Sequence, residues 1–407
     1  MRIEERRAGA ADLGVRELAV VGGAGLAIST IAFFRVPLLP SIGRDLALSP
    51  TLLSLFTVVF GVGRLLADVP AGRIADRFAP ARGLAIAGIV TAVGSFLLST
   101  SGSYRATLAA AAVIGVGSAL GNTIGMTFFS QAPPERRGAS MAVFSAALLG
   151  GQSLGPAFAG LLTVASGWRA AEATAGFGAI AVAAACLALG RRVETAHTPV
   201  PAGDEGGVHD ARLAGSVRVL LYIVPFAVFF ALGAMPQTVV PLIAAHGYGF
   251  SAGMIGLALG FGGVCRFAGA AVGGYVSDRL GRKAALIPGL ALMAGGIIAL
   301  DLHAGAALLV AAITAMSLGS YGVTVGATML ADLSGRGARG RRLGGFRFAG
   351  DGGLIVGPLV AGFLYDRFGT GASVFAVAGV LLACAVAAAV VLPETLPIRI
   401  PRGKRLL

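Results

Sequence analysis

The sequence predicts an all-α integral membrane protein of twelve transmembrane helices arranged in two similar halves. The chain is 56% hydrophobic and only 13% charged, and its mean hydropathy is +0.84, so it has too few polar side chains to coat a soluble domain of 407 residues. Apolar runs close to the roughly 20 residues that a helix needs to cross a bilayer recur along the chain. Features of the first half also recur at a fixed offset in the second half.

The apolar runs define two groups of six. The first run follows a charged tail, residues 1–16, and is too long for a signal-peptide core, so we expect it to be retained. Residues 191–216 carry charges and prolines among Gly and Thr, which predicts a solvated linker. We therefore predict an N-terminal bundle, 1–190, and a C-terminal bundle with a short tail, 217–407. The expected spans are 17–39, 51–72, 83–101, 105–129, 139–165, 169–190, 217–243, 252–275, 284–302, 305–329, 346–365 and 371–392.

The second half repeats the first at an offset of 202 positions. This offset relates Arg64 to Arg266 and Ser49 to Ser251. It also relates the Gly-Pro pair at 155–156 to the pair at 357–358, and the charged turn at 72–77 to the turn at 274–279. One offset that links several separated features indicates that the chain is a duplication.

The second of these turns carries a recognisable motif. Residues 274–283 read Gly-Tyr-Val-Ser-Asp-Arg-Leu-Gly-Arg-Lys. The pattern Gly-x-x-x-Asp-Arg-x-Gly-Arg-Lys, between the second and third spans of a half, resembles the signature loop of the major facilitator superfamily of secondary transporters. The first copy keeps Gly72, Asp76 and Arg77 but has Ala79 in place of the second glycine. The resemblance implies two pseudo-symmetric six-helix bundles that rock about a site near the middle of the membrane.

Basic residues indicate how the chain is oriented. If both termini and the linker share one side, the loops of the other side contain only four of the 32 basic residues, namely Arg44, Arg105, Arg169 and Arg367. By the positive-inside rule, the termini, the linker and the signature turns are then cytoplasmic. The composition favours a bacterial source, so we expect a multi-pass protein of the plasma (inner) membrane. The net charge of +13 reports this topology and does not indicate a nucleic-acid-binding face.

The signature turns and two charged pairs within the spans are candidates for gating and coupling. Asp76 or Asp278 can pair with an arginine and with a helix N-terminus of the other half, which would latch one conformation. Spans two and eleven, which pack together in the superfamily, each carry an arginine and an aspartate four residues apart. These pairs form either a structural latch or a latch that loosens when Asp68 binds a proton. The candidates are Arg64, Asp68, Asp76, Arg77, Asp278, Arg279, Arg282, Arg347 and Asp351.

Spans one, four, seven and ten line the central cavity in the superfamily. Here they offer a mostly apolar wall with scattered hydrogen-bonding groups, which suits a midsized organic solute, although each polar residue can equally bridge two helices. Arg266, on span eight, has no carboxylate three or four residues away on its own helix. If it faces the cavity with Arg35, the two favour an anionic or polar substrate; the alternative for Arg35 is a side chain that snorkels to the headgroups. The candidate substrate-binding residues are Arg35, Phe34, Asn122, Met126, Gln237, Arg266, Tyr321 and Thr324.

The favoured function is secondary transport by a monomer, most simply proton-coupled efflux of small organic compounds. The Gly-x-x-x-Gly-Pro sequence at 151–156 resembles a superfamily motif associated with antiporters, although the wider pattern is incomplete. Related exporters carry an arginine where Ala111 stands, and no carboxylate lies between Ala19 and Leu39, so proton coupling would depend on Asp68 or Asp351.

Two other functions stay open. One is an importer or facilitator of an organic anion without proton coupling, and the other is a transporter-like membrane sensor. The sequence has no GxxxxGKS/T loop and no clustered Cys and His ligands, so we expect no enzyme activity, cofactor or metal, and we exclude an ATP-driven pump for this chain alone.

Overall fold

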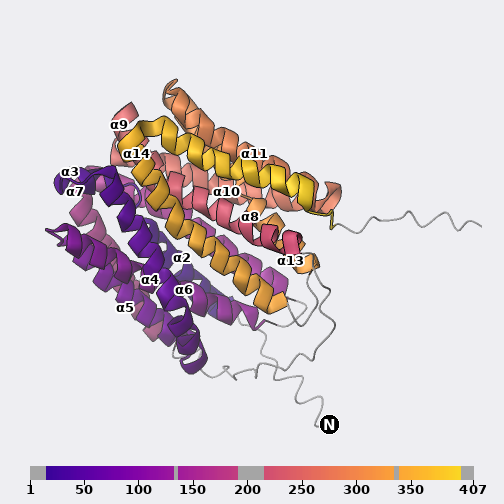
Figure 1. Ribbon diagram of the computed structural model, residues 1–407. Helices are drawn as coiled ribbons and strands as arrows, with labels where there is room; N and C mark the ends of the chain where they lie inside the picture. The colour runs from indigo at the N-terminus through magenta and orange to yellow at the C-terminus, as the bar shows by residue number, and fades with distance from the viewer. Residues whose placement is uncertain (1–14, 133–135, 191–214, 334–338, 396–407) are drawn as a thin grey trace, which may run out of the picture.

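The computed structural model describes residues 15–132, 136–190, 215–333 and 339–395, and these ranges consist of helices and connecting turns. The first half contains α2 (Val15–Phe33), α3 (Leu39–Asp45), α4 (Pro50–Arg77), α5 (Pro80–Ser99), α6 (Tyr104–Ser130) and α7 (Arg137–Gly190). The second contains α8 (Gly215–Ala234), the π-helix η2 (Met235–Val239), α9 (Val240–Tyr248), α10 (Ala252–Leu280), α11 (Arg282–Ala299), the 3-10 helix η3 (Leu300–Leu302), α12 (Ala306–Gly319), α13 (Gly322–Asp332) and α14 (Arg339–Val391). The two halves, indigo to magenta and pink to yellow, lie side by side (Figure 1).

The predicted all-helical membrane fold is confirmed. Nine helical segments of the described chain are long and apolar enough to cross a membrane. Two of them belong to α7 and α14, whose 54 and 53 residues would extend about 80 Å at 1.5 Å per residue, far beyond a hydrocarbon core of about 30 Å. Each therefore forms two spans, and the shorter apolar helix Leu18–Phe33 supplies span one.

The duplication is visible in the backbone. Gly167 breaks α7 and Gly369 breaks α14, both with φ of 83°, and the two glycines lie 202 positions apart. Ser49 and Ser251, at the same offset, cap the N-termini of α4 and α10 by accepting hydrogen bonds from backbone N–H groups at 3.4 and 3.3 Å. Both halves therefore use the same local devices to turn the chain and to begin a helix.

The halves meet along two equivalent helix pairs, α4 with α14 and α7 with α10. Gly160 of α7 lies against the backbone of Ala252, and Gly362 of α14 lies against Ser54. The two glycines occupy matching positions of the duplication. A Cβ atom at either position would collide with the facing helix, so small residues set the distance between the halves.

Spans one and seven are interrupted, whereas the sequence predicted continuous helices at 17–39 and 217–243. Span one leaves the helix after Phe33 and resumes as α3, and span seven passes through the π-helix η2 between α8 and α9. Pro37 and Pro236 lie in these interruptions, where a residue without a backbone N–H cannot complete a regular helix. Interrupted spans at matching positions mark the binding region in many secondary transporters.

The two ends of the bundle differ in the elements that they contain. The α3–α9 end holds the short helices α3 and α9, which pack against each other (Figure 1). α4 and α10 begin near this end and run to the turns at 77–80 and 280–282. The end that contains these turns is called the signature-turn end.

The two signature turns give a matched test of backbone strain. Gly281 precedes α11 with φ of 116°, whereas Ala79, its counterpart before α5, has φ of −56°. Gly281→Ala should lower thermal stability by about 1 to 3 kcal/mol, because its backbone is strained for any residue with a Cβ and the new Cβ would lie 2.5 Å from Oε2 of Glu394. Ala79→Gly should cost less than about 1 kcal/mol. Thermal unfolding of both purified variants checks this, and equal shifts would contradict the explanation.

Candidate functional site

Arg35 and Gln237 meet at the interruptions of spans one and seven. Nη2 of Arg35 donates to Oε1 of Gln237 at 2.9 Å, and the two residues lie 202 positions apart. Only 1% of Arg35 is exposed, its guanidinium lies 3.9 Å from the ring centroid of Phe60, and Nη1 makes a long contact of 3.5 Å with Oγ1 of Thr57. Arg35 is thus buried and does not snorkel. We call this contact the Arg35–Gln237 bridge; it joins the two halves.

Gln237 also lines a central cavity. This cavity measures about 60 Å³ and is lined by polar groups of Gln152, Gln237, Arg266 and Ser317 among apolar residues. An adjacent cavity of about 30 Å³ shares Gln152 and is lined also by Asn122. Such volumes hold one or two water molecules, at about 30 Å³ each, whereas sites for organic ligands usually measure about 300 Å³ or more. The centre is closed in this structure and must widen to admit a solute.

Arg266 is the charged group of the central cavity. It is half-buried on α10, and it forms no hydrogen bond or ion pair with any residue in the described part of the chain. The cavity lining contains no Asp or Glu. Because an unpaired guanidinium within a membrane protein is costly, Arg266 is suited to pair with an anionic or strongly polar group of a solute.

The other predicted substrate residues are distributed differently. Of the eight, Gln237, Arg266 and Asn122 line the two central cavities, and Arg35 lies behind Gln237. Phe34 is buried in an apolar cluster with residues of α5 and α7, and Tyr321 packs against Gly273 and Gly289. Met126 accepts a hydrogen bond from Arg347, and Thr324 is exposed; none of these four lines either cavity.

The charged residues of α4 and α14 face one another across the halves. Arg64 interacts electrostatically with Asp351, Arg347 and Asp68, but no two of the four form an ion pair within 4 Å. Their hydrogen-bond partners are neutral. Arg64 donates to Ser118 at 3.1 Å, Asp68 accepts from Thr123 at 3.3 Å, and Arg347 donates to Met126 of the other half at 3.1 Å. Arg64 and Asp68 do not pair with each other here, and the four charges interact over longer distances, with attraction between unlike charges and repulsion between like charges.

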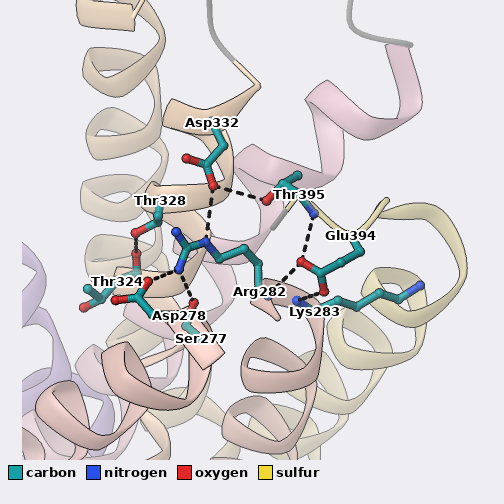
Figure 2. Close-up of polar contacts among 9 residues, drawn as sticks. All are labelled: Ser277, Asp278, Arg282, Lys283, Thr324, Thr328, Asp332, Glu394 and Thr395. Carbon is teal, nitrogen blue, oxygen red and sulfur yellow. Dashed lines mark hydrogen bonds and ion pairs between the residues drawn. The ribbon is translucent and has the colours of Figure 1, made fainter. Parts of the chain in front are cut away.

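The second signature turn builds a dense polar network (Figure 2). Arg282 forms an ion pair with Asp278, donates through Nε to Asp332 at 3.2 Å and donates through Nη1 to Ser277 at 3.1 Å. Glu394, which follows α14, accepts hydrogen bonds from the backbone N–H groups of Arg282 and Lys283 at 2.8 and 3.0 Å. A carboxylate at a helix N-terminus is favoured by both hydrogen bonding and the helix dipole. The network therefore fixes the ends of α10, α11, α13 and α14 together.

Asp278 pairs with the neighbouring Arg282 of its own half, and the contact with a helix N-terminus of the other half stays a prediction. Arg279 lies over the ring of Tyr275 at 4.5 Å, also within one half. In the first half, Pro80 and Ser130 occupy the positions that match Arg282 and Asp332, so the side chains at these two positions cannot form the same ion pair. Arg77 is exposed, and the side chain of Asp76 lies outside the described part of the structure.

Glu172 is a residue that the sequence analysis missed. It lies on α7 five residues after the break at Gly167, is only 1% exposed, and neither of its carboxylate oxygens has a hydrogen-bond partner among the described residues. A signal was available, because Glu172 is an ionisable residue within the predicted span 169–190.

A larger cavity of about 770 Å³ lies between the halves at the α3–α9 end. It is lined by Arg44, Asp45, Trp168 and His246, among other residues. Arg169 forms an ion pair with Asp45, and Trp168 donates to the same carboxylate at 3.3 Å. The Arg169 guanidinium holds the pKa of the Asp45 carboxyl below its ordinary value, so Asp45 is ionised at neutral pH. This pairing stabilises the fold above the ordinary carboxyl pKa and is lost as the pH falls through the lowered pKa.

Removing a side chain from the network of Figure 2 should lower the stability of the protein more than removing its counterpart in the first half. Asp332→Ala removes an acceptor from the side chain of Arg282, which is 13% exposed, and should destabilise the protein by about 1 to 2 kcal/mol. Ser130, at the matching position of the first half, donates to the carbonyl of Thr127 on its own helix, so Ser130→Ala should change stability by less than about 0.5 kcal/mol. Thermal unfolding measures both changes, and an equal effect in the two halves would be the contrary result.

A family model described as Major Facilitator Superfamily matches residues 21–265 and 221–405. No curated protein sequence is significantly similar to the chain.

Solved structures share the fold at low identity. A bacterial homologue of the human lysosomal transporter Spinster, inward-facing and unoccupied, is 15% identical with a TM-score of 0.66, over 91% of this chain and 94% of that one. A structure of a bacterial Spinster homologue in an inward-facing, occupied conformation is 15% identical with a TM-score of 0.69, again over 91% of this chain and 94% of that one. The xylose transporter XylE from E. coli, in an inward-open conformation, is 16% identical with a TM-score of 0.72, over 94% of this chain and 96% of that one. With a family model matching both halves and this fold, the chain belongs to the Major Facilitator Superfamily and is a secondary transporter that works by alternating access.

Proposed function

We propose that the protein is a proton-coupled exporter of small organic solutes that carry an anionic or strongly polar group. The observation that carries the proposal is Arg266, a guanidinium without a partner in the described chain, on the wall of the central cavity. We place the protein in the plasma (inner) membrane as a monomer with both termini cytoplasmic, on the distribution of its basic residues.

The chemistry of the cavity wall supports this substrate class. Arg266 and the amides of Gln152 and Gln237 can donate hydrogen bonds into the cavity, and the rest of the wall is largely apolar. An organic cation would approach an unpaired guanidinium with no carboxylate beside it, which is unfavourable at any effective dielectric. A solute with an apolar body and an anionic or polar head fits both parts of the wall.

The glycine and proline residues of span five support export as the direction of transport. Gly151 and Gly155 lie directly against the backbone of α2, and Pro156 of the same motif lines the central cavity. The close approach depends on residues without side chains. Since this Gly-Pro sequence resembles one associated with antiporters, it favours export in exchange for another ion.

Coupling to protons is supported by the carboxylates at the interface of the halves. Asp68 and Asp351 interact with Arg64 within the membrane, on two helices that must separate or slide during alternating access. Protonation of either would weaken its attraction to the arginines and so change the free energy of the closed interface.

A second candidate is a facilitator of organic anions without proton coupling. The free Arg266 suits this function equally well. The hydrogen bond from Thr123 to Asp68 favours it, because a carboxylate held by a neutral donor beside arginines can serve as a fixed structural element.

Reconstitution separates the two candidates. Proteoliposomes that contain a pH-sensitive dye receive gradients of benzenesulfonate, N-methylquinolinium or xylose. We expect benzenesulfonate to move with a proton signal, Arg266→Ala to lose at least about tenfold in benzenesulfonate flux, equivalent to about 1.4 kcal/mol, and Arg266→Lys to retain part of it. Asp68→Asn should reduce the proton signal.

Arg367→Ala is the matched control, since this arginine is exposed and lies outside the central cavities. Its flux should equal that of the wild type. Wild-type flux in Arg266→Ala would overturn the substrate class, and benzenesulfonate flux without any proton signal would favour the facilitator.

A further inference from the structure

Glu172 is a buried acid that the proposed function does not use. Neither oxygen meets hydrogen-bond geometry with a described residue; the hydroxyl of Ser95 on α5 faces the carboxyl group closely enough to interact with it, but does not form a regular hydrogen bond with it here. An ionised carboxylate without partners is among the costliest groups to bury in a protein or a membrane. Either a proton or a cation must therefore accompany Glu172.

The charged surroundings of Glu172 are sparse. α5 has no charged residue between Leu84 and Ser99, and α2 has none between Leu18 and Phe33. On its own helix, Arg169 is already paired with Asp45 of α3. The charged group that interacts with Glu172 is Arg35, whose Nε has no hydrogen-bond partner in the described chain.

Glu172 and Arg35 thus present an unused acceptor and an unused donor in the same buried region. Arg35 is held by the Arg35–Gln237 bridge and by the face of Phe60, not by the carboxylate. The Arg35 guanidinium therefore has two alternative partners for its strongest hydrogen bond. One contact leads to the other half of the protein, and the other leads to Glu172.

We propose that Glu172 is a proton-binding site of the transport cycle, and that Arg35 shifts from Gln237 to the Glu172 carboxylate when the proton leaves. This inference rests on the proposed function. In the step itself, the carboxyl O–H bond breaks, the proton passes to solvent, and the carboxylate charge is then balanced by the guanidinium; no electron is transferred.

The α3–α9 end supplies a route for the proton. Trp168 lies four residues before Glu172, hence on the same face of α7, and lines the 770 Å³ cavity. This cavity is separated from Glu172 by about one turn of helix. A proton therefore has a short path from the solvent at this end to Glu172.

The shift of Arg35 would act on both the gate and the solute site. Loss of the Arg35–Gln237 bridge removes a buried hydrogen bond between the halves. It also frees Oε1 of Gln237, which lines the central cavity together with Arg266. Proton release would thus loosen the interface and change the hydrogen bonds that the cavity offers to a solute.

A solute-free titration tests the proton site. Infrared spectra of purified protein in lipid nanodiscs, recorded across a pH series, should show a protonated-carboxyl C=O band that declines as the pH rises. Part of this band should be lost in Glu172→Gln and retained in Asp366→Asn, which removes an exposed carboxyl group without a proposed role. A spectrum in which Glu172→Gln removes no band at any pH overturns the proposal.

A distance measurement tests the coupling to the halves. Spin labels at Arg44→Cys on α3 and His246→Cys on α9 report on the α3–α9 end, where both residues are exposed. Cys265→Ser removes the half-buried cysteine, while Cys186 and Cys384 are buried. We expect the distance distribution to broaden as the pH rises, to stay at its low-pH form in Glu172→Gln, and to respond again in Glu172→Asp. An unchanged pH response in Glu172→Gln overturns the proposal.

Failure of this inference is distinguishable from failure of the proposed function. Both readouts are made without solute, whereas the proposed function is tested by the proton signal of the wild type with benzenesulfonate. If the wild type and Glu172→Gln give the same proton signal with benzenesulfonate, the proposed function stands and Glu172 is not the coupling site.

Discussion

The Arg35–Gln237 bridge is the contact on which the arrangement of the two halves depends. Two residues related by an internal duplication can touch each other only near the axis that relates the copies, so this hydrogen bond lies at the centre of the pseudo-symmetry. It also lies where spans one and seven depart from regular helix. Backbone irregularity, buried charge and the contact between the halves therefore coincide at one place.

Away from this bridge, the two halves meet through glycine contacts and through charged residues that form no direct ion pairs. Toward the α3–α9 end, glycines at matching positions bring α7 against α10 and α14 against α4. Glycine contacts hold helices close without fixing them through side-chain interlocking. The charged residues of α4 and α14 interact without direct ion pairs, which leaves them free to rearrange. An interface of this kind can open and close, as alternating access requires.

The two halves have diverged at the signature-turn end. Only the second copy retains the residues for a closed network, with Arg282, Asp332 and Glu394 holding four helix ends together (Figure 2). The first copy has Pro80 and Ser130 at two of these positions. The two copies therefore differ in the side chains available for such contacts. Ala79, which replaces the glycine of the motif, has a φ of −56° that alanine adopts without strain.

Much of the fold was predictable, because span length, the 202-residue offset and the signature turn are properties of local sequence. Arg266 was recognised as unshielded from its helical neighbours alone. The burial of Arg35 was not predictable, since it depends on Gln237, Thr57 and Phe60, which are distant in sequence. Glu172 was not among the predicted residues although its position in a span identified it, because the carboxylates predicted to take part in coupling were those at the expected interface of the halves. The interruption at η2 depends on tertiary packing, which the hydrophobic pattern of the sequence does not show.

The most direct test of this account is a double-mutant cycle on the Arg35–Gln237 bridge. Thermal or denaturant unfolding would be measured for the wild type, Arg35→Met, Gln237→Met and the double variant. If the bridge joins the halves, the coupling energy should be about 1 to 3 kcal/mol, as for a buried hydrogen bond to a charged group. A coupling energy close to zero would mean that the two residues act independently, and the central role assigned to their contact would be wrong.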